Sequence, residues 1–138
     1  MKDTFVLDAC ALIAILNDED GANKVDHVIQ KAESKECLIY MNKLNLLEVY
    51  YIICRKVGIK KADETLFDLL NTPLIIVDKL EDDVFKEAGR LKTKYKISLA
   101  DSIALAEAKV RNAILVTADH HEFDPIDKDG EINFCWIR

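Results

Sequence analysis

The chain has 138 residues, half of them hydrophobic, so it can bury one core and is not expected to be disordered. Its 25 acidic residues outnumber its 19 lysines and arginines. The resulting net charge of −6 argues against unspecific binding of nucleic acid through a generally basic surface, although a local basic groove is compatible with it. We expect residues 1–138 to form one domain.

Short apolar runs alternate with longer amphipathic stretches along the chain. In chain order, we expect a strand at 4–7, helices at 9–16 and 22–35, a strand at 37–41, helices at 43–57 and 60–70, a strand at 74–77, helices at 81–94 and 98–111, and strands at 114–116 and 132–137. Strands that alternate with helices form parallel sheets covered on both faces. The predicted fold class is therefore α/β, a three-layer α/β/α arrangement around a mainly parallel sheet.

Local signals set several of these boundaries. Asn42 is expected to cap the helix at 43–57, which Gly58 ends. Asp78 and Glu81 are expected to form a capping pair for the helix at 81–94. The helix at 43–57 is apolar nearly all round, so we expect it to be buried or paired with another subunit.

The four cysteines stand far apart and include no Cys-x-x-Cys pair. All lie in apolar runs, so we expect buried free thiols in a reducing cytosol, not a zinc site. The first residues lack the features of a signal peptide, and no apolar run approaches the ~20 residues that a membrane helix needs. These features predict a cytoplasmic protein with no membrane contact.

Four acidic residues stand out because of their apolar surroundings. Asp8 directly follows the first strand, at the edge where open α/β sheets hold ligands. Glu48 lies in the apolar helix at 43–57, where a buried carboxylate needs a cation, either a salt-bridge partner such as Arg55 or Arg111 or a metal ion. Capping alone would explain Asp8, and it would also explain the remaining two acids, Asp101 and Asp119.

Considered together, the four acids support a stronger hypothesis. Three of them lie at strand ends or in a first helical turn on the same side of the predicted sheet, and the fourth projects from an apolar helix. Converging carboxylates repel one another and their pKa values rise unless a cation neutralises them. Hard oxygen ligands select Mg²⁺ or Mn²⁺, which bind phosphate oxygens and activate water. The pattern therefore predicts metal-dependent phosphodiester hydrolysis.

These residues resemble a known family, the PIN domain. The likeness rests on four segments in the expected order: Val6-Leu7-Asp8, Glu48 in its apolar helix, Ser98-Leu99-Ala100-Asp101-Ser102-Ile103-Ala104, and Val116-Thr117-Ala118-Asp119-His120-His121-Glu122-Phe123. It covers nearly the whole chain, and its length is similar to that of the toxins of VapBC-type toxin–antitoxin pairs. The two C-terminal motifs are fairly specific, and the first two are weak on their own.

The resemblance implies a metal-dependent endoribonuclease. Asp8, Glu48, Asp101 and Asp119 would hold one or two Mg²⁺ or Mn²⁺ ions, and Thr117 would support the site by hydrogen bonding. RNA would be the substrate. The partners would be a second copy in a homodimer and a small antitoxin protein, with the helix at 43–57 as part of those surfaces. One departure stands out, because Ala9 and Cys10 replace the polar pair that often follows the first aspartate of the family.

Other polar residues are weaker candidates. His120 and His121 are adjacent in a predicted helix and point roughly 100° apart, so surface or capping roles are expected for them. Asp124 lies close to Asp119 in the sequence and could contact a second ion. A basic cluster near Ser98 is expected to be a solvated face that could also steer phosphate; it comprises Lys92, Lys94 and Lys96.

Two alternatives remain open. A phospho-receiver domain also carries an acid after its first strand and another after its third, here Asp78, but it usually has a second acid beside Asp8 and a lysine after the last strand. A non-catalytic partner-binding domain would use the four acids only as caps and ion pairs.

Overall fold

The computed structural model describes residues 2–138, and in this part of the chain five parallel strands form one sheet in the order β3-β2-β1-β4-β5. The strands are β1 (Asp3–Leu7), β2 (Cys37–Asn42), β3 (Leu74–Val77), β4 (Ile114–Thr117) and β5 (Asn133–Trp136). The helices are α1 (Ala9–Leu16), α2 (Ala22–Glu33), α3 (Lys43–Val57), α4 (Ile59–Leu70), α5 (Asp82–Lys94), α6 (Leu99–Val110) and α7 (His120–Lys128).

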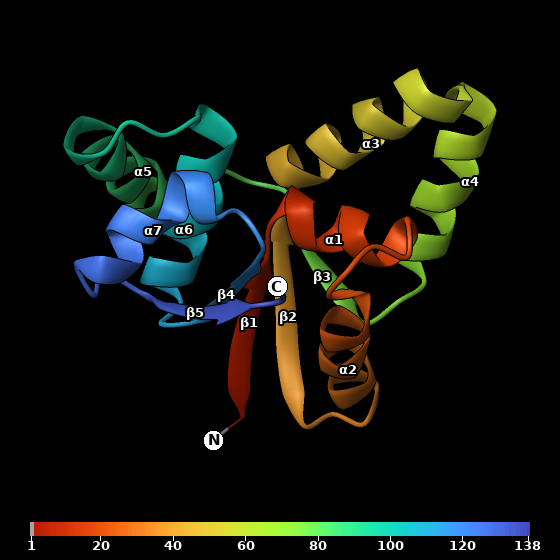
Figure 1. Ribbon diagram of the computed structural model, residues 1–138, viewed down its shortest axis with the longest axis horizontal. Coiled ribbons are helices and arrows are strands. Elements are labelled where there is room, and N and C mark those ends of the chain that lie inside the picture. The colour runs from red at the N-terminus through yellow and green to blue at the C-terminus, as the bar shows by residue number, and fades with distance from the viewer. Residues whose placement is uncertain (1) are drawn as a thin grey trace.

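Helices cover both faces of the sheet (Figure 1). Helices α1 to α4 lie on one side, and α5, α6 and α7 lie on the other. Each face of the sheet has its own hydrophobic core, and alternate residues of β1 point into opposite cores. Phe5 and Leu7 pack with helices α1 to α4, and Val6 packs with α5, α6 and α7. Burial on both faces explains why the strands are continuous apolar runs. The predicted three-layer α/β/α class is confirmed.

The centre of the sheet places the first and fourth strands side by side. Strand β1 pairs with β4 in a register that aligns Leu7 with Val116. Asp8 follows Leu7 directly and Thr117 follows Val116, so the two residues lie side by side at the carboxyl edge of the sheet. Strand β3 is at one edge, separated from β1 by β2. Asp78, which follows β3, is thus two strands away from Asp8, unlike the adjacent positions that a receiver domain's acids occupy.

Most of the predicted local signals are present. The Asn42 side chain accepts a hydrogen bond from the Leu44 backbone N–H, and Gly58 follows the last residue of α3. The capping pair of Asp78 and Glu81 was wrong, because Glu81 makes no side-chain capping bond. Asp78 instead forms an exposed ion pair with Lys43, whose Nζ atom lies 3.8 Å from the Asp78 Oδ1 atom.

The four cysteines are free, but only Cys37 is buried. Cys10, Cys54 and Cys135 are half-buried, so the prediction of four buried thiols was wrong for these three. Apolar neighbours in the sequence did not show which side of each element faces solvent. Among residues 2–138, no helix has the length and apolar character that spanning a membrane requires.

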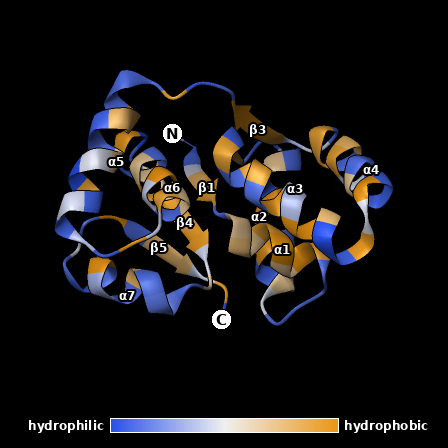
Figure 2. Ribbon diagram, turned by 90° about the horizontal axis from the view of Figure 1, so that it is seen from above, coloured by the Kyte–Doolittle hydropathy of each residue, from blue (hydrophilic) through white to orange (hydrophobic). Residues whose placement is uncertain are grey.

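Helices α3 and α4 carry many hydrophobic residues (Figure 2), and several of their side chains are exposed. On α3, Leu47 is 53% exposed and Val57 54%. On α4, Ile59 is 66% exposed and Phe67 69%. The isolated chain therefore buries only part of α3, so the prediction that this helix is buried holds for only one of its sides.

Candidate active site

Asp8 lies at the junction of β1 and α1 and is only 2% exposed. Its carboxylate accepts a hydrogen bond from the Ala11 backbone N–H at 2.8 Å, so it caps α1 as the sequence predicts. It also accepts a hydrogen bond from the Thr117 hydroxyl. That hydroxyl is held in turn by the Asp119 backbone N–H at 3.0 Å. Thr117 therefore holds the Asp8 carboxylate by hydrogen bonding.

The pKa of Asp8 is raised to about 7, chiefly by burial. The hydrogen bonds from Thr117 and Ala11 lower it, and the charges of Asp101 and Asp119 raise it. Asp8 therefore titrates near neutral pH in the folded chain. The Asp8 carboxylate has two hydrogen-bond donors, and among residues 2–138 it forms no ion pair.

Asp101 lies in the first turn of α6 and is half-buried. The Ser98 hydroxyl accepts a hydrogen bond from the Asp101 backbone N–H at 3.1 Å, which is the predicted cap. The pKa of the Asp101 carboxyl is raised to about 7, chiefly by burial, although a hydrogen bond with the Ser98 side chain lowers it. The charges of Asp119, Glu122 and Glu48 raise it as well. Asp101 is thus surrounded by other acids.

Glu48 lies on α3 and is half-buried. Burial raises its pKa, and the charge of Asp119 adds to this effect. The two arginines that could have neutralised it are engaged elsewhere. Arg55 lies over the Tyr51 ring at 5.0 Å, and Arg111 pairs with Glu107 at 3.1 Å. A structural salt bridge therefore does not account for Glu48.

Asp119 follows β4 and caps α7 by accepting a hydrogen bond from the Glu122 backbone N–H at 3.1 Å. Its charge acts on Asp8, Glu48 and Asp101 alike. Glu122 is an additional acid of this region, because its charge acts on Asp101. Its position three residues after Asp119 indicated only a capping role in the sequence.

The four acids therefore share one electrostatic neighbourhood, although they come from four separate elements. Within residues 2–138, none of them forms an ion pair with a lysine, arginine or histidine. In the same residues, no three histidine, cysteine, aspartate or glutamate side chains are gathered closely enough to hold a metal ion. The acids can shift one another's pKa values without being close enough to share a metal ion, because charge–charge interactions act over longer distances than metal–ligand bonds.

The chemistry of these donors fits a hard divalent cation. They are carboxylates, the ligands that Mg²⁺ and Mn²⁺ prefer. The pKa values of Asp8, Glu48 and Asp101 are raised, first by burial and then by neighbouring acids. Binding of one ion would require the side chains to move closer together than they are here.

Polar contacts join the end of β2 and the start of α3 to α6. The Asn42 amide donates a hydrogen bond of 2.7 Å to the Glu107 carboxylate, and Glu107 is fully buried. Arg111 neutralises Glu107 and also lies over the Tyr40 ring at 4.1 Å. Nearer the acids, the Asn45 amide donates a hydrogen bond of 2.9 Å to the Ala100 carbonyl. These contacts fix the position of α3 relative to α6.

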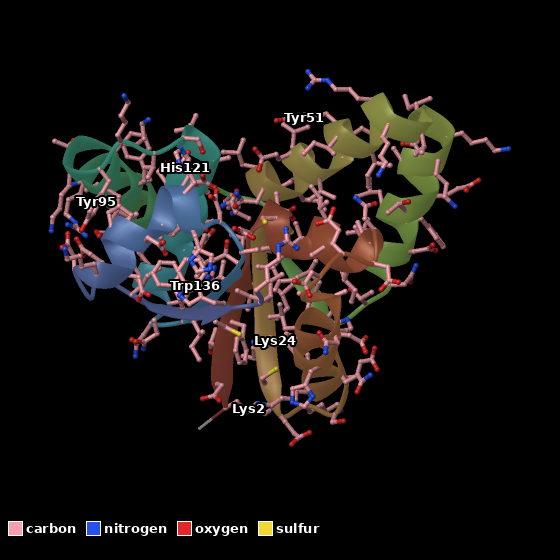
Figure 3. All side chains as sticks on the ribbon, viewed as in Figure 1. Lys2, Lys24, Tyr51, Tyr95, His121 and Trp136 are labelled. Carbon is pink, nitrogen blue, oxygen red and sulfur yellow. The ribbon has the colours of Figure 1, made fainter. Side chains whose placement is uncertain are left out.

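The weaker candidates have other partners. Asp124 is exposed and hydrogen bonds with His120 at 2.7 Å, and the His120 ring stacks on Trp136. His121 is exposed at the carboxyl end of the sheet, at the same end of the molecule as Tyr51 of α3 and opposite to Lys2 (Figure 3).

The basic cluster near Ser98 is largely occupied with structural contacts. Lys92 donates a hydrogen bond to the Ile97 carbonyl at 2.6 Å, and Lys94 pairs with Glu131 at 3.0 Å. Of the two residues that replace the family's polar pair, Ala9 is buried and Cys10 is half-buried, with a thiol pKa raised by burial and then by Asp8.

Comparisons with known proteins give a family and a fold. Residues 5–129 match the family described as PIN domain. No curated protein sequence matches the chain. Among solved structures, the chain is similar to VapBC2 from Rickettsia felis bound to a DNA fragment from their promoter, with a TM-score of 0.76, 21% identity, and coverage of 96% of this chain and 97% of that chain.

Two further structures have the same fold. DNA-bound VapBC from Salmonella typhimurium has a TM-score of 0.76 at 14% identity and covers 100% of both chains. VapC20 from Mycobacterium tuberculosis, a toxin that cleaves the sarcin-ricin loop, has a TM-score of 0.67 at 13% identity and covers 88% of this chain and 94% of that chain. At these identities the likeness establishes the fold.

Proposed function

Because this chain belongs to the PIN-domain family, a family of metal-dependent nucleases, we propose that it is an endoribonuclease that hydrolyses RNA phosphodiester bonds with Mg²⁺ or Mn²⁺. One observation carries the proposal. Asp8, Glu48, Asp101 and Asp119 act on one another electrostatically, and none has a cationic partner among residues 2–138. Acids needed only for capping would have no reason to share one unneutralised region.

In this function, the same four carboxylates would hold the metal ion. When bound, the ion would supply Lewis acidity toward the phosphate and would lower the pKa of a water molecule. The Thr117 hydroxyl holds the Asp8 carboxylate in place, and the Asp119 backbone N–H holds Thr117. Asp8 and Asp101 must be ionised to bind a cation, so activity should rise as the pH passes their pKa of about 7.

We also propose that the chain is the toxin of a type II toxin–antitoxin pair, that it forms a homodimer, and that residues 1–138 are one domain. The structural neighbours include toxin–antitoxin complexes, such as one from Klebsiella pneumoniae. The exposed apolar residues of α3 and α4 form a surface that a second copy of the chain or an antitoxin could bury. They are Leu47, Tyr51, Val57, Ile59, Phe67 and Leu70.

The proposal is tested with purified protein and RNA in the presence of Mg²⁺ or Mn²⁺. We expect cleavage that a chelator stops and that Asp101→Asn abolishes while the circular dichroism spectrum is unchanged. Asp82→Asn is the matched control, because Asp82 is an exposed aspartate in the first turn of the neighbouring helix α5. Cleavage that persists in the chelator would refute a metal mechanism, and absence of cleavage with partner binding intact would favour a non-catalytic domain.

A further inference from the structure

Asn45 is a buried polar residue whose hydrogen bonding is incomplete. It lies on α3 and is 1% exposed. Its Nδ2 atom donates to the Ala100 carbonyl at 2.9 Å, which fixes the identity of the amide oxygen, because a carbonyl can only accept. The Oδ1 atom has no hydrogen-bond partner among residues 2–138.

Stability does not explain this residue. A buried acceptor without a partner destabilises a fold by about 1–3 kcal/mol, whereas a hydrogen bond contributes about 1 kcal/mol. An apolar side chain of similar volume would satisfy the packing without the unpaired oxygen. The hydrogen bond from Asn45 to Ala100 therefore contributes little to the stability of the fold.

That bond spans the two elements that carry Glu48 and Asp101. Asn45 is three residues before Glu48, so both lie on the same side of α3. The Ala100 carbonyl belongs to the peptide group that connects Ala100 to Asp101. A displacement of α3 from α6 would break the bond and separate the two acids. Two negatively charged carboxylates on the two elements repel each other, and this repulsion favours that displacement.

We propose that Asn45 is a positioning residue that keeps the backbone segments carrying Glu48 and Asp101 from moving apart under the repulsion of the two carboxylates, so that both side chains can reach the same divalent ion. This inference rests on the proposed function, because it assigns the two acids to one metal site. It deepens that function by adding a residue that contacts neither the ion nor the RNA. Loss of the Asn45 bond should weaken metal binding in a chain that is still folded.

Asn42, the last residue of β2 and the N-cap of α3, provides a matched control. It is also a buried asparagine, 5% exposed, and its Nδ2 atom also donates to α6, to the Glu107 carboxylate at 2.7 Å. Glu107 is six residues beyond Asp101, about 9 Å along the helix axis. Asn42 thus joins the start of α3 to α6 at a distance from the acids. Asn42→Ser keeps a capping oxygen and removes the contact with Glu107.

The experiment measures Mn²⁺ affinity by isothermal titration calorimetry, with no RNA present, for the wild type, Asn45→Leu and Asn42→Ser. Thermal unfolding of each variant verifies that it is folded. We expect Asn45→Leu to weaken Mn²⁺ binding roughly tenfold, the usual effect of losing a residue that orients a metal ligand. Asn42→Ser should bind within roughly twofold of the wild type, because it leaves the Asn45 bond in place.

An unchanged affinity in Asn45→Leu would overturn the inference. Equal weakening in both variants would also overturn it, because general packing of α3 on α6 would then be sufficient. If Asn45→Leu does not fold, Asn45→Ala removes the same donor without a branched side chain and takes its place. A wild-type chain that binds no Mn²⁺ would instead contradict the proposed function, so the two failures are distinguishable.

Discussion

Asp101→Asn should stabilise the metal-free protein, and the gain should depend on pH. The folded-state pKa of Asp101 is raised from 3.8 to about 7. The folded chain therefore binds more protons than the unfolded chain between these two values, and the wild type loses stability as the pH rises through this window. Asparagine carries no charge, so the variant escapes this loss.

The magnitude follows from the same shift. At about 1.4 kcal/mol for each pH unit, the interval from 3.8 to about 7 sets an upper limit of roughly 4 kcal/mol. Asp101 is partly exposed, and solvent screening reduces this limit. We therefore expect a gain of about 1–2 kcal/mol at pH 8, corresponding to roughly 4–8 °C in Tm. At pH 4 the gain should be close to zero.

The assay is thermal or urea unfolding at pH 4, 6 and 8 in the presence of a chelator. Asp82→Asn is again the control, because the Asp82 carboxylate is exposed in the first turn of α5. It should lose a few tenths of a kcal/mol from the helix dipole and show no gain with rising pH. A destabilised Asp101→Asn variant at pH 8, or a gain of the same size at every pH, would refute the electrostatic reasoning.

Further predictions concern other parts of the molecule. Mn²⁺ affinity, measured by calorimetry, should increase from pH 5 to pH 8, because protons compete for Asp8 and Asp101; a flat profile would argue against these ligands. Glu48→Gln should abolish RNA cleavage in a gel assay without a change in circular dichroism. Arg111→Ala should reduce the free energy of unfolding in urea by roughly 3 kcal/mol, because it leaves the buried Glu107 carboxylate without its cation. Gly21→Ala should also lower Tm, because φ at Gly21 is +95° and a Cβ atom there would lie 2.5 Å from the Ile137 carbonyl oxygen.

Much of the fold was predictable because it depends on local patterns. The apolar runs marked the five strands, and the caps at Asp8, Asn42, Ser98 and Asp119 marked the starts of four helices. Each of these caps joins residues two or three positions apart, so its two partners are visible in one short stretch of sequence. The Asp78 and Glu81 pair shows the limit of this reasoning. The residues had the right types and spacing, but Asp78 pairs with Lys43 from a different element.

The candidate site was predictable in its residue types but not in its environment. Nothing near Glu48 in the sequence shows that Arg55 lies on Tyr51 and that Arg111 pairs with Glu107, although these two contacts remove its candidate partners. The influence of Glu122 on Asp101 was likewise hidden, because 21 positions separate the two residues and Glu122 appeared to belong to a cap.

The sequence by itself therefore determined the strands, the helices, their caps and four acids in apolar settings, since hydrophobic periodicity and short-range hydrogen bonds are properties of neighbouring residues. Tertiary structure alone decided the strand order, the raised pKa values of Asp8 and Asp101, and the bond from Asn45 to Ala100 across 55 positions. Burial and charge at a residue depend on every element packed around it, and those elements come from distant parts of the chain.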